Sequence, residues 1–281
     1  MEIAVASGKG GTGKTLVATC LARILADYDP VLIDADVEEP NAGLVIPHQN
    51  INNWPVFRPV PAIDMTSCTL CGKCAELCRF NALVVLPGEV MVFSELCHSC
   101  GLCAYICPEN AINEVNHPIG VIEESDLLSG GHLITGRLIV GEVQSPPLIK
   151  AAREAKRQDS EYRVVDCPPG TTCPAIESIR DSDFCLLVTE PSLFGAHDLE
   201  LSIAATKLLG ISTGIIINRW QGDDGDVGII AGEQDIPILE RIPYSLELAK
   251  SYARGGNPLD ALPELRVILE KIIDKVKERV V

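Results

Sequence analysis

The chain has 281 residues, 47% of them hydrophobic, and its 39 acidic against 23 basic side chains give a formal net charge of −16 at pH 7. This length allows one large domain and a small module, whereas the acidity argues against nucleic acid as a main partner and, more weakly, against an anionic membrane. The sequence begins directly with a strand-like segment, and no apolar run approaches the ~20 residues of a membrane span, so we expect a cytoplasmic globular protein.

The first predicted elements are a strand at 3–5, a glycine-rich loop and a helix at 16–26. The loop, residues 7–15, reads SGKGGTGKT and fits the phosphate-binding pattern G-x-x-x-x-G-K-[ST] in the strand–loop–helix context that this pattern requires. Glycines let backbone N–H groups turn toward a phosphate, and the helix N-terminus adds its dipole. An ordinary tight turn is the alternative. We predict nucleotide contacts from Gly8, Gly10, Gly11, Gly13, Lys14, Thr15 and Leu16.

Two lysines in this loop have different expected roles. Lys14 would reach the β- and γ-phosphates, while the Thr15 hydroxyl would bind Mg²⁺. A phosphate cradle does not need Lys9, but K-G-G-T-G-K-T resembles the deviant Walker motif of the MinD/ParA/nitrogenase-iron-protein group of P-loop ATPases. The resemblance implies that Lys9 reaches the nucleotide of a partner subunit, and hence a homodimer across the nucleotide; a solvated loop lysine is the alternative. Leu16 departs from the group, which usually has a second Ser or Thr there.

Residues 30–36, PVLIDAD, form a continuous apolar run that ends in two carboxylates, which predicts a buried parallel strand. Ligands bind at the carboxyl ends of such strands, so Asp34 and Asp36 should point toward the phosphates. The pattern D-x-D-x-x-x-P-N resembles switch I of the same group. The resemblance implies that Asp36 orients or activates the attacking water and that Asp34 supports Mg²⁺. Helix capping is the alternative for each.

Residues 47–65 are rich in Pro and Asn, and we predict a linker there. Eight of the 12 cysteines follow in two sets with the spacing C-x₂-C-x₂-C-x₃-C, offset by 29 residues. The repeat resembles a bacterial two-cluster ferredoxin, in which the fourth cysteine of one motif ligates the cluster of the other. The resemblance implies one [4Fe–4S] cluster on Cys68, Cys71, Cys74 and Cys107, and a second on Cys97, Cys100, Cys103 and Cys78.

Zinc and disulfides are the competing uses of these cysteines. Zinc sites use pairs of C-x₂-C with four ligands per ion, so a third cysteine at the same spacing has no use there. Disulfides form in secreted chains, whereas cytosolic thiols stay reduced. Arg79 stands where the ferredoxin pattern often has Pro, which leaves the local turn open. Residues 84–93, with Pro87-Gly88 at their centre, predict a hairpin between the two motifs.

The chain then returns to the main sheet, because two apolar runs between 120 and 143 predict strands and a helix is expected at 146–158. A strand at 162–165 is followed by DCPPG, residues 166–170, which resembles the Walker B and switch II segment. The resemblance implies that Asp166 holds Mg²⁺ through water and that the Gly170 amide senses the γ-phosphate. A capping Asp is the alternative.

Further core strands are predicted at 184–189, 215–217 and 236–242. By resemblance to the same group, Asn218 would read the adenine with Arg219 beside it, and Pro243 would pack near the base. The N-K-x-D motif of GTP-binding proteins does not occur in the sequence, so ATP is favoured over GTP. The amphipathic segment 262–281 predicts a helix that docks on the core; a membrane-surface helix is the alternative.

Four cysteines lie outside the two motifs. Cys20 and Cys185 are expected to pack in the core as small hydrophobic side chains. Cys167 and Cys173 belong to the switch II segment, and whether they form a third, intersubunit metal site stays open.

Together the two resemblances imply an α/β fold, with a mainly parallel P-loop NTPase sheet and an inserted small α+β ferredoxin domain. The expected division is ATPase 1–57, ferredoxin 58–118 and ATPase 119–281, with ATP, Mg²⁺ and two [4Fe–4S] clusters as cofactors. The function implied is an ATP-hydrolysing homodimeric switch that gates electron transfer to a redox partner protein. The first alternative is an ATPase that assembles or carries clusters for a client protein; the second is a MinD-like positioning ATPase with structural clusters.

Overall fold

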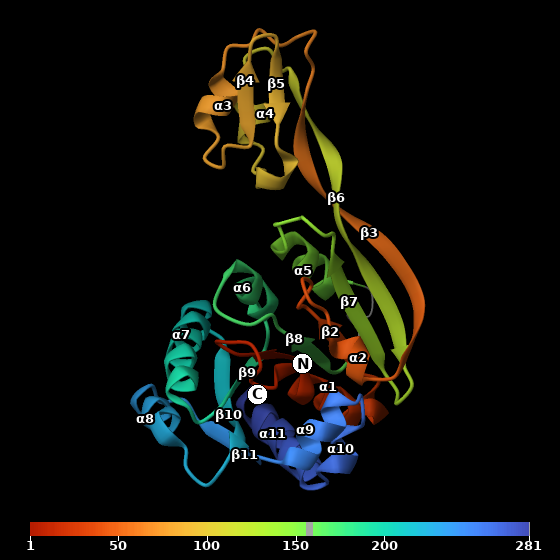
Figure 1. The fold of residues 1–281 in the computed structure, drawn as a ribbon, viewed down its shortest axis with the longest axis vertical. Coiled ribbons are helices and arrows are strands. Elements are labelled where there is room, and N and C mark those ends of the chain that lie inside the picture. Colours follow the sequence, from red (N-terminus) through yellow and green to blue (C-terminus); the bar gives the residue numbers. More distant parts are fainter. Residues whose placement is uncertain (156–159, 281) are drawn as a thin grey trace.

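The computed structural model describes residues 1–155 and 160–280. A nine-stranded sheet in the order β11-β10-β9-β1-β8-β2-β7-β6-β3 forms the main body, and the hairpin β4-β5 belongs to a separate small lobe (Figure 1). The strands are β1 Glu2–Ala6, β2 Val31–Asp34, β3 His48–Ile63, β4 Leu83–Leu86, β5 Glu89–Val92, β6 Ile112–Leu127, β7 His132–Leu138, β8 Arg163–Asp166, β9 Phe184–Thr189, β10 Ser212–Trp220 and β11 Ile238–Pro243.

Helices cover both faces of the sheet and part of the lobe. The helices are α1 Lys14–Ile24, α2 Ala42–Val45, α3 Lys73–Leu77, α4 Leu102–Ile106, α5 Pro146–Arg153, α6 Cys173–Ile179, α7 Leu193–Leu209, α8 Gly225–Glu233, α9 Leu246–Ala253, α10 Pro258–Ala261 and α11 Glu264–Val280, with short 3₁₀ turns η1 Ala26–Tyr28 and η2 Ser94–Leu96.

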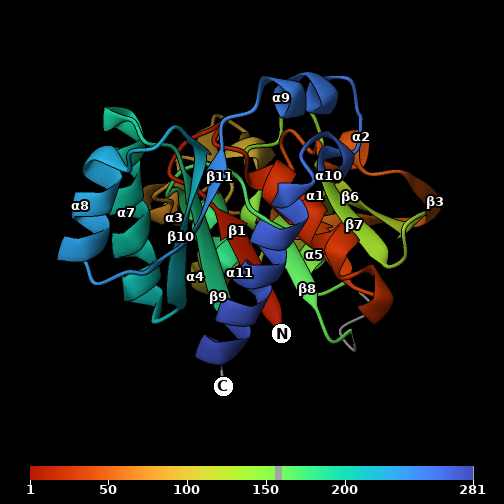
Figure 2. The same ribbon diagram turned by 90° about the horizontal axis from the view of Figure 1, so that it is seen from below.

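The strands of the main sheet are apolar on both sides because helices cover both faces. Along β1, Ile3 and Val5 face the cluster that includes α1, α9, α10 and α11, whereas Ala4 and Ala6 face the cluster that includes α5 to α8 (Figure 2). This alternation follows from the two-residue period of a strand. It explains why the parallel strands read as unbroken apolar runs in the sequence.

The mainly parallel α/β fold is confirmed. The strands predicted at 3–5, 30–36, 162–165, 184–189, 215–217 and 236–242 correspond to β1, β2, β8, β9, β10 and β11, and all of them pair in parallel. The two predicted return strands are also present: β7 pairs parallel with β2, and β6 pairs antiparallel with β7. Because the parallel strands all run in the same direction, their carboxyl ends lie at one edge of the sheet, where a ligand site is expected.

The linker predicted at 47–65 is wrong, because this segment is the 16-residue strand β3. It pairs antiparallel with β6 along its whole length, from His48 opposite Leu127 to Ile63 opposite Ile112. The prolines that suggested a linker lack an N–H donor, but β3 is the last strand of the sheet, and an edge strand tolerates them. Composition alone could not reveal a pairing partner so distant in sequence.

The β3–β6 pair also carries the small lobe. Strand β7 pairs with β6 only between Gly120 and Asp126, so the other half of the ribbon continues beyond the main sheet. At its far end lie α3, the hairpin β4-β5 and α4, well separated from the helices that cover the sheet (Figure 1). The hairpin predicted at 84–93 is thus confirmed, with Gly88 at φ +92° in its turn.

The helices predicted at 146–158 and 262–281 are present as α5 and α11. Helix α5 ends at Arg153, earlier than the predicted 158, and residues 156–158 of that prediction lie outside the described residues. Helix α11 docks on the core as predicted, with Leu265, Leu269 and Ile272 among its buried residues; residue 281 lies outside the described part. Within the described residues, no helix combines the length and apolarity needed to cross a membrane.

Candidate functional site

The glycine-rich loop joins β1 to α1. Gly11 and Gly13 have φ values of +77° and +101°, a region that favours glycine, and Gly13 caps α1. A Cβ on Gly13 would lie 2.3 Å from Nδ2 of Asn218, and one on Gly8 would lie 2.3 Å from the carbonyl oxygen of Asp198. Both positions therefore require glycine for the loop to keep this close contact with its neighbours.

A cavity of about 630 Å³ lies over this loop, within the usual size range of small-molecule sites. Part of its wall is apolar and includes Leu44, Leu248, Tyr244 and Tyr252. A flat, apolar base would fit that wall, while the loop would hold phosphates. Ten predicted site residues line the cavity: Gly10, Gly11, Gly13, Lys14, Thr15, Leu16, Asp36, Asn218, Arg219 and Pro243.

Three charged side chains lie near one another beside the glycine-rich loop: Lys14 and Asp36, which line the cavity, and Asp166, which is not among its lining residues. Lys14 is buried, which lowers the pKa of its ammonium, although Asp166 and Asp36 oppose the shift. Burial raises the pKa of Asp36, against the attraction of Lys14. Burial also raises the pKa of Asp166 to about 7, against the Thr15 hydroxyl and Lys14. The site thus holds charges that an anion and a cation would stabilise.

Asp166 fits the role of a magnesium-holding carboxylate. Both of its carboxylate oxygens are buried; the Thr15 hydroxyl lies near enough to favour the charged form, but neither oxygen has a hydrogen bond of good geometry in the part of the chain that the structure describes. A buried polar group without a partner is costly, and Mg²⁺ with its bound waters prefers oxygen ligands of this kind. Asp166 and Thr15, at the end of β8 and the start of α1, would hold the ion together.

Asp34 has a different environment. Its Oδ2 accepts a hydrogen bond from the backbone N–H of Ala42 at 2.9 Å, and its Oδ1 accepts one from Asp36 at 3.3 Å. The carboxylate thus holds the loop between β2 and α2, which is what the capping alternative describes, and its role toward Mg²⁺ stays a prediction. Burial, and then the nearby Asp166, raise the pKa of Asp34 well above its ordinary value.

Lys9 does not line the cavity but forms an ion pair with Glu190. The other oxygen of Glu190 accepts a hydrogen bond from Arg219 at 3.0 Å, and Arg219 also donates to the carbonyl oxygen of Gly11 at 2.9 Å. Burial raises the pKa of Glu190, but the two cations together leave it lowered. Glu190 was not predicted from the sequence; its place directly after β9, at the carboxyl edge of the sheet, was the available signal.

Gly170 also lies outside the cavity lining. Its φ is +92°, and its N–H donates to the carbonyl oxygen of Ser7 at 2.9 Å. The amide predicted to sense the γ-phosphate is therefore engaged in this conformation, and that role stays a prediction.

The two cysteine motifs of the lobe have the same backbone conformation around their short helices α3 and α4. Gly72 and Gly101, with φ of +80° and +70°, cap α3 and α4 in turn. Each motif directs two backbone N–H groups at its own cysteine sulfurs. These bonds run from Leu70 to Cys68 at 3.4 Å, from Ser99 to Cys97 at 3.4 Å, from Ala82 to Cys78 at 3.4 Å and from Ala111 to Cys107 at 3.3 Å. The 29-residue repeat of the sequence is thus also a repeat in space.

Two cavities divide the eight cysteines between them. One is lined by Cys68, Cys71, Cys74 and Cys107, and the other by Cys78, Cys97, Cys100, Cys103 and again Cys74. Within residues 1–155 and 160–280, no three His, Cys, Asp or Glu side chains converge on the position of a single metal ion. Each thiolate of a cubane cluster binds its own iron, so a cluster does not need such convergence. These donor sets fit clusters better than single ions.

The four cysteines outside the two motifs differ in how far they are buried. Cys20 and Cys185 are fully buried, as predicted. Cys167 is also fully buried, and this burial raises the pKa of its thiol to about 12, whereas Cys173 is exposed at the start of α6. A thiolate at Cys167 is therefore disfavoured in this conformation.

Comparison with known sequences identifies a family over most of the chain. The family described as the CobQ/CobB/MinD/ParA nucleotide binding domain matches residues 3–259. An uncharacterized protein of Methanocaldococcus jannaschii is 31% identical over 281 residues, which cover 99% of this chain and 97% of that protein. An iron–sulfur cluster carrier protein of Pyrococcus furiosus is 22% identical over 304 residues, covering 99% of this chain and 87% of the carrier.

Among solved structures, the septum site-determining protein MinD of Pyrococcus horikoshii, in complex with Mg-ADP, superimposes with a TM-score of 0.58. The two chains share 18% identity, and the alignment covers 100% of this chain and 98% of that one. At this identity the likeness establishes the fold alone.

Proposed function

This chain belongs to the CobQ/CobB/MinD/ParA family of nucleotide-binding domains, and from that premise we propose that it is an ATP-hydrolysing dimeric switch that gates electron transfer from two [4Fe–4S] clusters to a partner protein. Family membership establishes the MinD/ParA-like P-loop domain. The finer proposal rests on one observation, the division of the eight lobe cysteines between two cavities at the end of a ribbon that continues the main sheet. When bound, such clusters accept and release single electrons.

At the nucleotide end, we assign roles by position in the cavity. The loop glycines and Lys14 bind the phosphates, and Thr15 with Asp166 holds Mg²⁺. Asp36 accepts a hydrogen bond from the attacking water and orients it. Asn218, Arg219 and Pro243 line the same cavity, and we assign them to the part that receives the base. These assignments place the phosphates beside the carboxylates of Asp36 and Asp166, whose pKa values are raised by burial.

The contacts of Lys9 bear on how the proposed dimer would close. In the single chain Lys9 is paired with Glu190, so reaching a partner's nucleotide means exchanging one anion for another. Glu190 keeps its contact with Arg219 after this exchange, and its charge therefore remains compensated. The exchange therefore breaks the Lys9–Glu190 pair but leaves Glu190 beside a second cation, Arg219.

The proposed division of the chain into 1–57, 58–118 and 119–281 falls inside the β3–β6 ribbon. The pairing register of this ribbon shifts between Val56, opposite Gly120, and Phe57, opposite Pro118. A bulge of this kind bends a strand pair and increases its twist. A bend at the boundary supports treating residues 58–118 as a ferredoxin domain that is attached to the ATPase through the ribbon.

A second candidate, a cluster carrier or assembly ATPase, is favoured by the relatives that bear the name iron–sulfur cluster carrier protein. The two functions differ in what leaves the protein, since a carrier loses iron and sulfide to a client whereas an electron-transfer protein keeps them.

One anaerobic experiment separates the candidates. The reduced, iron-loaded chain is mixed with a one-electron acceptor dye or with an apo-ferredoxin, each with and without Mg-ATP. The proposal predicts that Mg-ATP changes the rate of dye reduction, that iron stays with the chain, and that a Lys14→Ala variant shows no effect of ATP. Transfer of iron to the apo-ferredoxin with no effect on dye reduction would overturn the proposal and support the carrier.

A further inference from the structure

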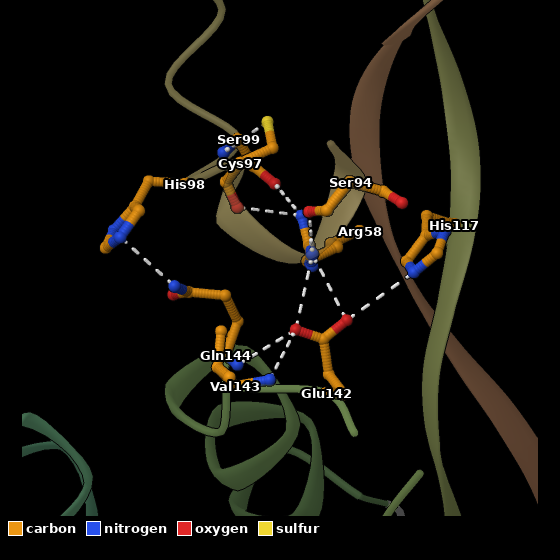
Figure 3. Close-up of polar contacts among 9 residues, drawn as sticks. All are labelled: Arg58, Ser94, Cys97, His98, Ser99, His117, Glu142, Val143 and Gln144. Atoms are coloured by element: carbon orange, nitrogen blue, oxygen red, sulfur yellow. Dashed lines mark hydrogen bonds and ion pairs between the residues drawn. The ribbon is translucent and has the colours of Figure 1, made fainter. Parts of the chain in front are cut away.

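A buried ion pair joins the cysteine lobe to the main domain. Arg58 lies on β3 and Glu142 in the loop between β7 and α5; their side chains are 2% and 3% exposed, and 3.1 Å separate Nη2 from Oε2 (Figure 3). Neither residue was predicted from the sequence to have a functional role. Ionised groups are seldom buried to this extent unless they are paired and hydrogen-bonded, so the contacts of both ends bear on what the pair does.

The guanidinium end holds the second cysteine motif by its backbone. Arg58 donates from Nη1 to the carbonyl oxygen of Cys97 at 2.9 Å and from Nη2 to that of Ser94 at 2.6 Å. Both carbonyls belong to the turn η2 and its following residue, where this motif begins, as Figure 3 shows. A rigid planar fork that bonds two carbonyls at once fixes the position of that turn.

The carboxylate end holds the loop before α5. Glu142 accepts hydrogen bonds from the backbone N–H groups of Val143 and Gln144, both at 2.9 Å. The next residue, Ser145, is buried and donates from Oγ to Oε1 of Glu38 at 3.0 Å. Glu38 lies two positions after Asp36, in the loop between β2 and α2. The contacts therefore run unbroken from the second cysteine motif to the loop at the nucleotide cavity.

The first cysteine motif lacks this connection. Its residues equivalent to Ser94 and Cys97, 29 positions earlier, are Met65 and Cys68. Within the described residues, no side chain donates a hydrogen bond to either carbonyl oxygen, and the turn there is held instead by Asp64, which accepts from Thr66 N–H at 2.9 Å. The first motif thus forms its turn without an arginine, with Cys68 N–H bonded to the carbonyl oxygen of Asp64, whereas Cys97 N–H is bonded to that of Ser94.

We propose that Arg58 and Glu142 are positioning residues that couple the second cysteine motif to the nucleotide loop 35–41 through Ser145 and Glu38. The inference deepens the proposed function and rests on it in one respect, that a nucleotide acts on this loop. Coupling between two sites is reciprocal, so disturbing either end must be felt at the other. The connection singles out the second motif, with Cys97, Cys100 and Cys103, as the one that responds to nucleotide.

Hydrogen exchange of the full, iron-loaded chain, measured by mass spectrometry, tests the coupling. Without nucleotide, Arg58→Lys keeps the charge but loses the fork, and we expect exchange to become at least about threefold faster at 94–99 and also at 35–41, but not at 65–70. With Mg-ATP, the unchanged chain should exchange more slowly at 94–99. Ser145→Ala should remove this response, whereas Ser182→Ala, which loses a matched Ser–Glu bond of 3.2 Å elsewhere, should retain it.

Unchanged exchange at 35–41 in Arg58→Lys, or a nucleotide response at 94–99 that survives Ser145→Ala, would overturn the coupling. Ser145→Ala leaves the buried ion pair intact, so its result does not depend on whether Arg58→Lys folds. A chain that bound no Mg-ATP would overturn the proposed function instead, and the nucleotide-free comparison of Arg58→Lys would still decide the coupling.

Discussion

Replacing Asp166 by Asn should stabilise the nucleotide-free chain at alkaline pH. Burial raises the pKa of Asp166 from 3.8 to about 7, and each pKa unit corresponds to about 1.4 kcal/mol, so keeping this carboxylate ionised in the folded state at pH 8 costs about 4 kcal/mol. Asn removes the charge but leaves a buried amide without a partner, which costs about 1–3 kcal/mol. The free energy of unfolding should therefore rise by about 1–3 kcal/mol at pH 8.

The sign of the pH dependence is a sharper test. Because the pKa is raised in the folded state, the unchanged chain loses stability as pH rises from about 4 to about 7, and below pH 4 the acid is neutral in both states. Urea unfolding in EDTA, at pH 8 and pH 4, should show the advantage of Asp166→Asn at the higher pH alone. Added Mg-ADP should then stabilise the unchanged chain more than the variant. A variant that is no more stable at pH 8 would refute the reasoning.

Three further predictions concern the core, the lobe and the dimer. Leu269→Ala on α11 should lower the free energy of unfolding by about 2–5 kcal/mol, whereas Val267→Ala on the exposed face should change it by less than about 0.5 kcal/mol; equal losses would contradict a core-docked helix. Cys107→Ser should reduce the iron content by about half and Cys20→Ser should not, as judged by iron and sulfide analysis; equal iron counts would contradict the ligand assignment. Glu190→Gln should let Mg-ATP dimerise the chain at lower protein concentration in sedimentation experiments, because Lys9 loses its intrachain partner. An unchanged dissociation constant of the dimer would contradict the proposed exchange of Lys9 from Glu190 to the partner's nucleotide.

The parts of the fold that the sequence predicted are those set by local pattern. Strands such as β1 and β9 are covered on both faces, so they appear as continuous apolar runs whatever surrounds them. The phosphate loop was predictable because Gly8 and Gly13 are required by contacts that admit no side chain. The cysteine spacing was predictable for a similar reason, since short intervals between thiols are set by the ligated group.

What the sequence could not reveal depends on partners distant in the chain. Strand β3 pairs with residues 112–127, and its prolines look like breaks until its place at the sheet edge is known. Glu190 and Arg58 belong to no sequence motif. Their roles become visible only through contacts with residues more than 80 positions away, Lys9 for Glu190 and Glu142 for Arg58. Asp34 was predicted only in part: its position at the end of a strand was predicted from the sequence, but its two backbone contacts were visible only in the structure.

The central claim, that the nucleotide site and the clusters act on each other, is tested most directly by the affinity of the iron-loaded chain for ATP. Binding of a slowly hydrolysed ATP analogue with Mg²⁺ would be titrated anaerobically in the oxidised protein and again after reduction by dithionite, with iron counted on the same sample. The account predicts affinities that differ severalfold between the two redox states, and a difference that Ser145→Ala diminishes. Equal affinities in a chain that holds about eight irons would contradict it.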